Sequence, residues 1–484
     1  MVIETLSDDV LLEIFDLCLD KDEDIDPWYE MNNEREKWYS YDAWYTLAHV
    51  CQRWRYVVFA SPRRLNLRLH CSRRRVREML GVWPAFPIVI WDIAGLTTDE
   101  DNIIAALEHR DRVCEIKLGP LSRLESEKLV PHMQESFPAL TKLQIESCSS
   151  TRDERPVLPD SFLGGSAPHL RFLYLDYIFF PAFSSLLLSA SNLVYLYLDC
   201  IPSGYISPEM VAALSALNKL EDMRLCFGHP YSDSDLEDRA PLSLTRSVLP
   251  VLRGLELRGE GEYLDDFVAR IDIPSINYLK IQPSNRPFFV GDFFHLPQFI
   301  DRVGNFRSFD YALFDLSNQV IHVTLSMNTW TRNSPPGALQ LDFLCDTVDP
   351  LSSLVLASTT PLLPLSNIEN FAISTSYSLR DSQSGFDTED PRWLDILREF
   401  SAAKSLYLGA MGFVPPVAFA LKQVVEERMT GVLPAIQELT VSDSLSAGPV
   451  REAIEQFATA RGLSVFETSG SSKWRISARD THEG

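Results

Sequence analysis

The sequence has few basic residues, and this shortage restricts the partners it can have. Its 484 residues contain 44 Lys and Arg against 67 Asp and Glu, a formal net charge of −23. A phosphate backbone is bound by a basic surface, so this balance argues against nucleic acid as the general partner. The balance is typical of a soluble acidic protein.

Closely spaced cysteines and long apolar runs are also absent. The eight cysteines form no CxxC pair and no short ladder, whereas disulfide scaffolds and zinc sites need such spacings. No apolar run of 18 residues could span a membrane, and Met1-Val2-Ile3-Glu4 does not begin a signal peptide. We therefore expect reduced cysteines, no membrane partner, and a cytoplasmic or nuclear location.

Motifs that carry catalysis or hold a cofactor are missing as well. There is no P-loop, GxSxG or HExxH, and Leu264 stands where the dinucleotide fingerprint beginning at Gly259 needs its third glycine. Asp20-x-Asp22-x-Asp24 begins like a calcium loop, but Ile25 occupies the glycine position. We expect no catalytic residue, no metal and no cofactor.

Residues 5–62 predict a small helical unit. Ser7 can cap a helix whose first turn carries Asp8 and Asp9, the charge sign that a helix N-terminus favours. Apolar residues then recur at helical spacing, as Val10, Leu11, Ile14, Phe15 and Cys18, and as Leu47, Val50, Cys51, Trp54, Val57 and Val58 in a second helix that Pro62 ends. So small a unit cannot bury all of this surface within itself, and part of it should face a partner.

These helices resemble an F-box, the motif by which substrate receptors dock on the Skp adaptor of cullin-RING ubiquitin ligases, and the large fungal F-box family in particular. The resemblance is carried by Leu6, Val10, Leu11, Ile14 and Phe15 and, after an insertion at 20–42, by Val50, Cys51 and Trp54. Ser7 stands where that family usually has proline. The resemblance implies that residues 1–62 bind a Skp-type adaptor through these side chains, and through it a cullin.

A repeat organises the rest of the chain. Apolar residues at positions 1, 4 and 6 recur mostly every 23 to 33 residues, as 113/116/118, 140/143/145, 170/173/175, 193/196/198, 220/223/225, 252/255/257, 276/279/281, 351/354/356, 368/371/373 and 436/439/441. Proline stands two residues before the first position at 138, 168, 250, 274 and 434, which marks a recurring corner between helix and strand. Strand followed by helix, repeated, predicts an α/β leucine-rich-repeat solenoid with a curved parallel sheet.

The predicted solenoid covers residues 63–466 and is followed by a tail at 467–484. Its register is irregular at 283–347, where 306/309/311 and 320/323/325 are only 14 residues apart, and 315–319 could be a hairpin turn. An F-box joined to leucine-rich repeats resembles a receptor class in which the repeats hold the substrate. The resemblance therefore implies a substrate-recognition subunit of a Skp-cullin-F-box ubiquitin ligase that binds an unidentified target protein.

Strand geometry predicts which side chains would contact the target. Where positions 1, 4 and 6 are buried, positions 3 and 5 project from the concave face. This places four aromatic residues in adjacent rows: Phe172, Tyr174, Tyr195 and Tyr197. Charged residues and one more tyrosine continue the surface beside them: Asp222, Arg224, Arg258, Tyr278 and Lys280. The aromatic residues could form an exposed anchor patch, or equally a cross-strand ladder that only stabilises the sheet.

Residues 53–77 contain nine arginines and no acidic residue. They could bind an anion or an acidic partner or act as a nuclear signal, but the interpretation we favour is a solvated helix face with salt bridges to the acidic insert at 20–26. Two further functions remain as alternatives to the ligase subunit. One is a protein-binding scaffold whose N-terminal helices only cap the repeats, and the other is an enzyme with an unrecognised site.

Overall fold

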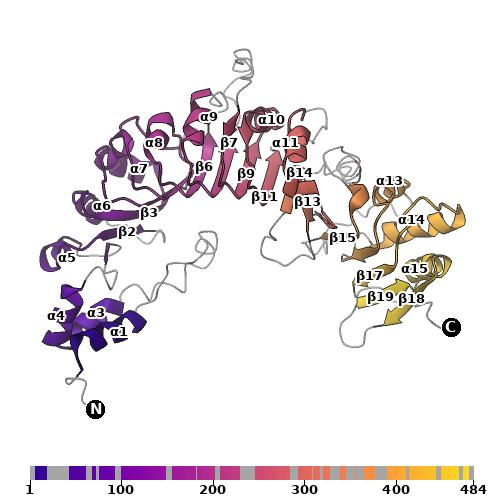
Figure 1. Cartoon of the computed structure of the whole chain (residues 1–484), viewed down its shortest axis with the longest axis horizontal. Coiled ribbons are helices and arrows are strands. Elements are labelled where there is room, and N and C mark those ends of the chain that lie inside the picture. Colours follow the sequence, from indigo (N-terminus) through magenta and orange to yellow (C-terminus); the bar gives the residue numbers. More distant parts are fainter. Residues whose placement is uncertain are drawn as a thin grey trace. The chain divides into compact units, whose positions relative to one another are not determined.

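The computed structural model describes most of the chain, and its residues form two compact units, Met1–Cys200 and Ile201–Gly484 (Figure 1). The described residues are 6–18, 43–61, 68–71, 76–92, 100–148, 155–180, 183–201, 208–228, 246–283, 293–307, 309–316, 320–327, 338–344, 351, 355, 365–375, 390–409, 414–442, 448–467 and 473–478. The insertion predicted at 20–42 and two positions of the repeat at 351/354/356 lie outside them.

Three short helices form the N-terminal part of the first unit: α1 (Asp8–Cys18), α3 (Ala43–Val50) and α4 (Gln52–Ala60). The Ser7 hydroxyl accepts a hydrogen bond from the Val10 amide, as expected of a helix cap. The second predicted helix is interrupted, because Cys51 is extended and its sulfur accepts from the Trp54 amide, so that α4 begins anew. As predicted, α4 ends before Pro62.

The rest of the first unit alternates strands with helices and is built on a parallel sheet. Its strands pair in chain order, with short helices between them: β1 (Leu69–Cys71), α5 (Val76–Val82), β2 (Ile88–Asp92), α6 (Glu100–Leu107), β3 (Val113–Leu121), α7 (Arg123–Leu129), β4 (Lys142–Ser147), β5 (Phe172–Asp176), α8 (Phe183–Ser189) and β6 (Tyr195–Ile201). In Figure 1 the helices α6, α7 and α8 lie along one side of these strands.

The second unit repeats this plan and interrupts it once. Its elements are α9 (Pro208–Ser215), β7 (Asp222–Phe227), β8 (Ser247–Val248), β9 (Gly254–Gly259), α10 (Gly261–Ala269), β10 (Ile271–Asp272), β11 (Tyr278–Pro283), α11 (Leu296–Arg302), β12 (Tyr311–Leu316), β13 (Val320–Ser326), β14 (Ala338–Leu344), β15 (Asn370–Thr375), α13 (Arg392–Glu399), β16 (Ser405–Leu408), α14 (Val414–Glu426), β17 (Glu438–Ser442), α15 (Pro449–Ala460), β18 (Leu463–Glu467) and β19 (Lys473–Ala478). Part of the predicted tail is therefore a strand, β19, which pairs with β17 and β18.

The irregular region at 283–347 is an antiparallel insertion of three strands. The strand after β11 in the sheet is β14, which runs parallel to β11. Next comes β13, which is antiparallel to β14, and then β12, which is antiparallel to β13. Beyond them β12 pairs in parallel with β15, where the regular order resumes. The hairpin suggested at 315–319 is confirmed by the antiparallel pairing of β12 with β13, and the third strand of the insertion, β14, was not predicted.

Buried side chains at positions 1, 4 and 6 hold strands and helices together. All three positions are buried in every predicted copy except 351/354/356, so the phase of the repeat is confirmed there. The backbone corner is also repeated, because the amide at position 1 donates to the carbonyl three residues earlier, as in Leu140 to Phe137, Leu170 to Ala167 and Leu220 to Leu217. The large parallel sheet of a mixed α/β fold is thus built on one recurring set of three buried side chains, at positions 1, 4 and 6, which we call the wedge.

None of the described helices is both long and apolar enough to cross a membrane.

Truncating one buried wedge residue should destabilise the first unit. Leu173 is fully buried, and Leu173→Ala should cost about 2–5 kcal/mol through lost burial and the cavity left behind. Differential scanning calorimetry should show a clearly lower melting temperature. The matched control is Leu124→Ala on α7, because Leu124 is 70% exposed and its truncation should change the melting temperature little. Equal effects of the two substitutions would contradict the burial pattern.

Candidate functional site

One face of α1 carries apolar side chains that the described part of the chain leaves exposed. Val10 and Ile14 are 44% and 37% exposed, and Leu17 continues the same face one turn later. We call these three residues the α1 stripe. Val50 and Cys51 are also exposed, at the junction of α3 and α4. An exposed apolar face of this kind is a common feature of protein-binding surfaces.

Other residues of the predicted docking set lie inside the helical unit. Leu11 and Phe15 are buried, and the Phe15 ring lies 4.8 Å from the ring of Trp54, which is half-buried. The two buried residues hold the three helices together, so the expectation that they contact a partner directly is corrected. Leu6 is half-buried, at the start of α1.

Arginines of the basic stretch fix the helices to one another. Arg53 on α4 donates to the Leu6 carbonyl and, at 2.8 Å, to the Asp8 carboxylate, which secures the start of α1. Arg55 donates to the Ala48 carbonyl at the end of α3. Farther along, Arg68 forms an ion pair with Glu115. The predicted partners in the acidic insert at 20–26, like the arginines at 63, 64 and 73–75, lie outside the described residues.

A different face of the helical unit packs on the start of the repeats. The Phe59 ring meets Trp83 edge to face at 5.6 Å and Phe86 at 5.7 Å. His49 contacts Trp83 in the same way at 6.0 Å. The helices are thus joined to the first repeats through α3 and α4, while the α1 stripe remains exposed.

The four predicted aromatic residues do lie together. Of their two interpretations, an exposed patch or a cross-strand ladder, the structure shows the ladder. Phe172 stacks on Tyr195 with centroids 4.5 Å apart, and Tyr174 stacks on Tyr197 at 4.2 Å. Stacking covers the ring faces, and Phe172, Tyr174 and Tyr195 are buried, while Tyr197 is only partly so. The block is a cross-strand ladder that stabilises the sheet, and the expectation that it is an exposed target-binding patch is corrected for these three residues.

A half-buried carboxyl group lies at the end of this ladder. The Tyr197 hydroxyl donates to Asp176 at 3.2 Å, and Asp199 accepts from the Cys200 amide at 2.7 Å. Burial, with the nearby negative charge of Asp199, raises the pKa of Asp176 to about 7. Asp176 therefore exchanges its proton near neutral pH, unlike an ordinary aspartate.

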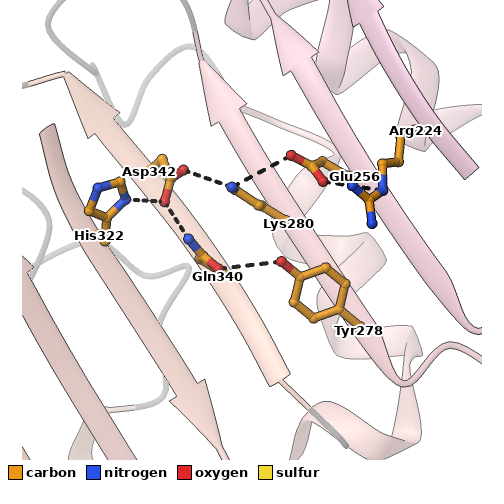
Figure 2. Close-up of polar contacts among 7 residues, drawn as sticks. All are labelled: Arg224, Glu256, Tyr278, Lys280, His322, Gln340 and Asp342. Atoms are coloured by element: carbon orange, nitrogen blue, oxygen red, sulfur yellow. Dashed lines mark hydrogen bonds and ion pairs between the residues drawn. The ribbon is translucent and has the colours of Figure 1, made fainter. Parts of the chain in front are cut away.

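Figure 2 shows the second unit's most extensive polar network, which crosses β7, β9, β11, β14 and β13. Glu256 lies 3.6 Å from Arg224 and 3.5 Å from Lys280, which in turn lies 3.5 Å from Asp342. The chain of contacts ends at His322, whose Nδ1 is 2.7 Å from Asp342. We call these five residues the polar row.

Asp342 is the buried centre of the polar row, with an exposed fraction of 1%. It accepts a hydrogen bond from Gln340 at 2.9 Å, and Gln340 also accepts from the Tyr278 hydroxyl. Burial alone would raise the pKa of the Asp342 carboxyl, but the hydrogen bond with His322 and the charge of Lys280 outweigh it, and the pKa is lowered. The carboxylate is thus held ionised inside the sheet.

The structure brings together some of the predicted target-contacting residues and adds others. Arg224, Tyr278 and Lys280 belong to this network, whereas Asp222 and Arg258 are exposed on either side of it. Sequence reasoning missed Gln340, Asp342 and His322 because no repeat register was found at 283–347. The alternation of polar and apolar residues in 338–343 and 320–325 could have revealed them.

Among the described residues no group of three or more His, Cys, Asp or Glu side chains could hold a metal ion.

Comparison with known proteins finds weak similarity to solved structures. No protein-family model and no curated protein matches the chain. A solved structure of a leucine-rich repeat-containing protein, LegL7 from Legionella pneumophila, is similar over 81% of this chain and 97% of that one, at 11% identity and a TM-score of 0.26. So low a TM-score supports no inference about function.

Neutralising Asp176 should change the pH dependence of stability. The folded pKa of about 7 lies above the ordinary value of 3.8, so between these values the folded state keeps a proton that the unfolded state has lost, and stability falls as pH rises. Asp176→Asn removes this loss. Relative to the unsubstituted protein, its melting temperature should rise steadily from pH 4 to pH 7 and then level off. A pH-independent difference would contradict the raised pKa.

Removing the Asp342 carboxylate should loosen the inserted strands. Asp342→Ala leaves His322, Gln340 and Lys280 without their shared acceptor, and we expect a loss of about 1.5–3 kcal/mol in the free energy of unfolding. Chemical denaturation of the full chain measures it. Glu369→Ala is the control, since it removes one partner of an exposed pair with Lys404, which contributes about 0–1 kcal/mol.

Proposed function

We propose that the chain is the substrate-recognition subunit of a Skp-cullin-F-box type ubiquitin ligase. The N-terminal helices dock on a Skp-type adaptor, which connects the chain to a cullin, and the repeats bind a target protein. The chain itself is a non-catalytic adaptor that brings the target close to the ligase. This proposal combines the resemblance of residues 6–54 to an F-box with the exposure of the α1 stripe.

The α1 stripe is the observation that carries the proposal. Val10, Ile14 and Leu17 follow one face of α1 and are left exposed by the described residues, although each costs free energy in contact with water. Val50 and Cys51 add exposed surface where α3 meets α4. Burial of such side chains contributes about 1.5–3 kcal/mol each before the cost of association, enough for a stable complex.

The internal arrangement of the helices supports the same function. Phe15 on Trp54, and Arg53 on Leu6 and Asp8, hold α1 against α4. The stripe is therefore presented on a fixed scaffold, which lowers the entropy lost on binding. In this arrangement Leu11, Phe15 and Trp54 support the docking surface from within, while Val10, Ile14, Val50 and Cys51 contact the adaptor.

A protein-binding scaffold unrelated to ubiquitination is the second candidate. It is favoured by the packing of Phe59 on Trp83 and Phe86, because a helical cap on the first repeats would make the same contact. A cap alone does not account for the α1 stripe, which faces away from any described packing partner. The two functions therefore differ in whether a separate protein covers that stripe.

Co-expression with a Skp-type adaptor tests the proposal. The full chain should co-purify with the adaptor, and Ile14→Asp should abolish the complex, because it places a charge in the centre of the stripe. Leu124→Asp is the control, since Leu124 is also apolar and exposed but lies on α7, and it should leave the complex intact. Circular dichroism of each variant checks that the repeats stay folded.

Retention of the adaptor by a folded Ile14→Asp variant would contradict the docking surface. Failure of the unsubstituted chain to bind any Skp-type adaptor would favour the scaffold.

A further inference from the structure

One cation on the sheet of the second unit has no partner of opposite charge among the described residues. Arg258 on β9 is exposed, and its side chain takes part in no ion pair or hydrogen bond with those residues. The neighbouring cations differ from it, because Arg224 and Lys280 share Glu256. Arg258 thus lies beside the polar row with its guanidinium unpaired among the described residues.

The register of the strands shows what surrounds Arg258. Directly opposite it lie Cys226 on β7 and Gln282 on β11, neither of which has a carboxylate. Arg224 and Lys280 occupy the diagonal positions, about 8 Å away between Cα atoms. Arg224 and Lys280 share Glu256, and Lys280 also lies 3.5 Å from Asp342, whereas no described carboxylate balances the charge of Arg258.

The other acidic groups of this face leave Arg258 free. Asp342 is buried and engaged by His322, Gln340 and Lys280. Asp222 is exposed but lies at the opposite end of its strand, directly across from Gly254, where the Asp222 carboxylate approaches the glycine. Arg258 is consequently the cation that these acidic groups leave unbalanced, and we call the end of β7, β9 and β11 that carries it the cationic end.

We propose that this cationic end binds an acidic segment of the target protein, with the Arg258 guanidinium holding a carboxylate in a two-pronged contact. The inference rests on the proposed function only for the idea that the repeats bind a target. Arg258 supplies the planar fork that matches a carboxylate, and Arg224 and Lys280 supply positive charge on either side. A segment with alternating acidic residues places several carboxylates within reach of the three cations.

The charge of the whole chain makes such a site selective. A net charge of −23 repels acidic proteins in general, so only a segment that reaches the cationic end gains more than it loses. Binding should therefore weaken as salt screens the local attraction.

Fluorescence anisotropy with the full chain tests the proposal. The probe is a fluorescein-labelled peptide in which Glu alternates with Ser, and the reference peptide has Gln in place of each Glu. We expect the Glu peptide to bind more tightly, and Arg258→Glu to weaken it by at least about tenfold, or ~1.4 kcal/mol. The matched control is Arg253→Glu, because Arg253 lies just before β9, is equally exposed and changes the net charge identically.

Each outcome either supports or overturns the proposed acidic-segment site. Tighter binding of the Glu peptide that is lost in Arg258→Glu and kept in Arg253→Glu supports the site. Equal binding of the Glu and Gln peptides, equal loss in both variants, or binding only when the Ser residues are phosphorylated overturns it. Adaptor binding by the same Arg258→Glu protein is measured in parallel, since its retention separates failure at this site from failure of the proposed function.

Discussion

Each strand of the repeat buries its wedge of three apolar residues, and this constraint governs the remainder of the structure. A single strand and helix cannot cover that wedge, so neighbouring units must stack in register. The stacking fixes the backbone pairing, and the pairing decides which side chains stand in line on the other face. The stacked rings at Phe172–Tyr195 and the polar row from Arg224 to His322 both follow from it.

The two units put the same positions to different use. In the first unit, positions 3 and 5 of β5 and β6 hold aromatic rings that cover one another and so reduce exposed surface. In the second, position 5 of β7, β9 and β11 holds Arg224, Glu256 and Lys280, and Arg258, two residues after Glu256, is left without a described carboxylate partner. The first arrangement stabilises a sheet, and the second leaves charge available for a partner.

The fold could be predicted from sequence wherever the period of the pattern was kept. Leu170, Leu173 and Leu175 indicate a strand unambiguously, and the proline two residues earlier marks its start. The pattern says less about exposure, because a Tyr or Phe at position 3 or 5 can point outward and still be covered by its neighbour. Phe15 shows the same limit, since helical spacing marks it as apolar but does not distinguish a core residue from a docking residue. Alternation could have marked the strands of Asp342 and His322, but not their neighbours in the sheet, because these strands pair out of chain order.

The insertion of β12, β13 and β14 contains an odd number of strands, and this parity has a consequence for how such a chain can grow. An odd antiparallel insertion returns the sheet to its original direction, so β15 can pair as though it followed β11. An even one would reverse every later strand and send the following helices to the wrong end of their strands. A repeat protein of this type can therefore lengthen its sheet by three strands at once without rebuilding the units that come after.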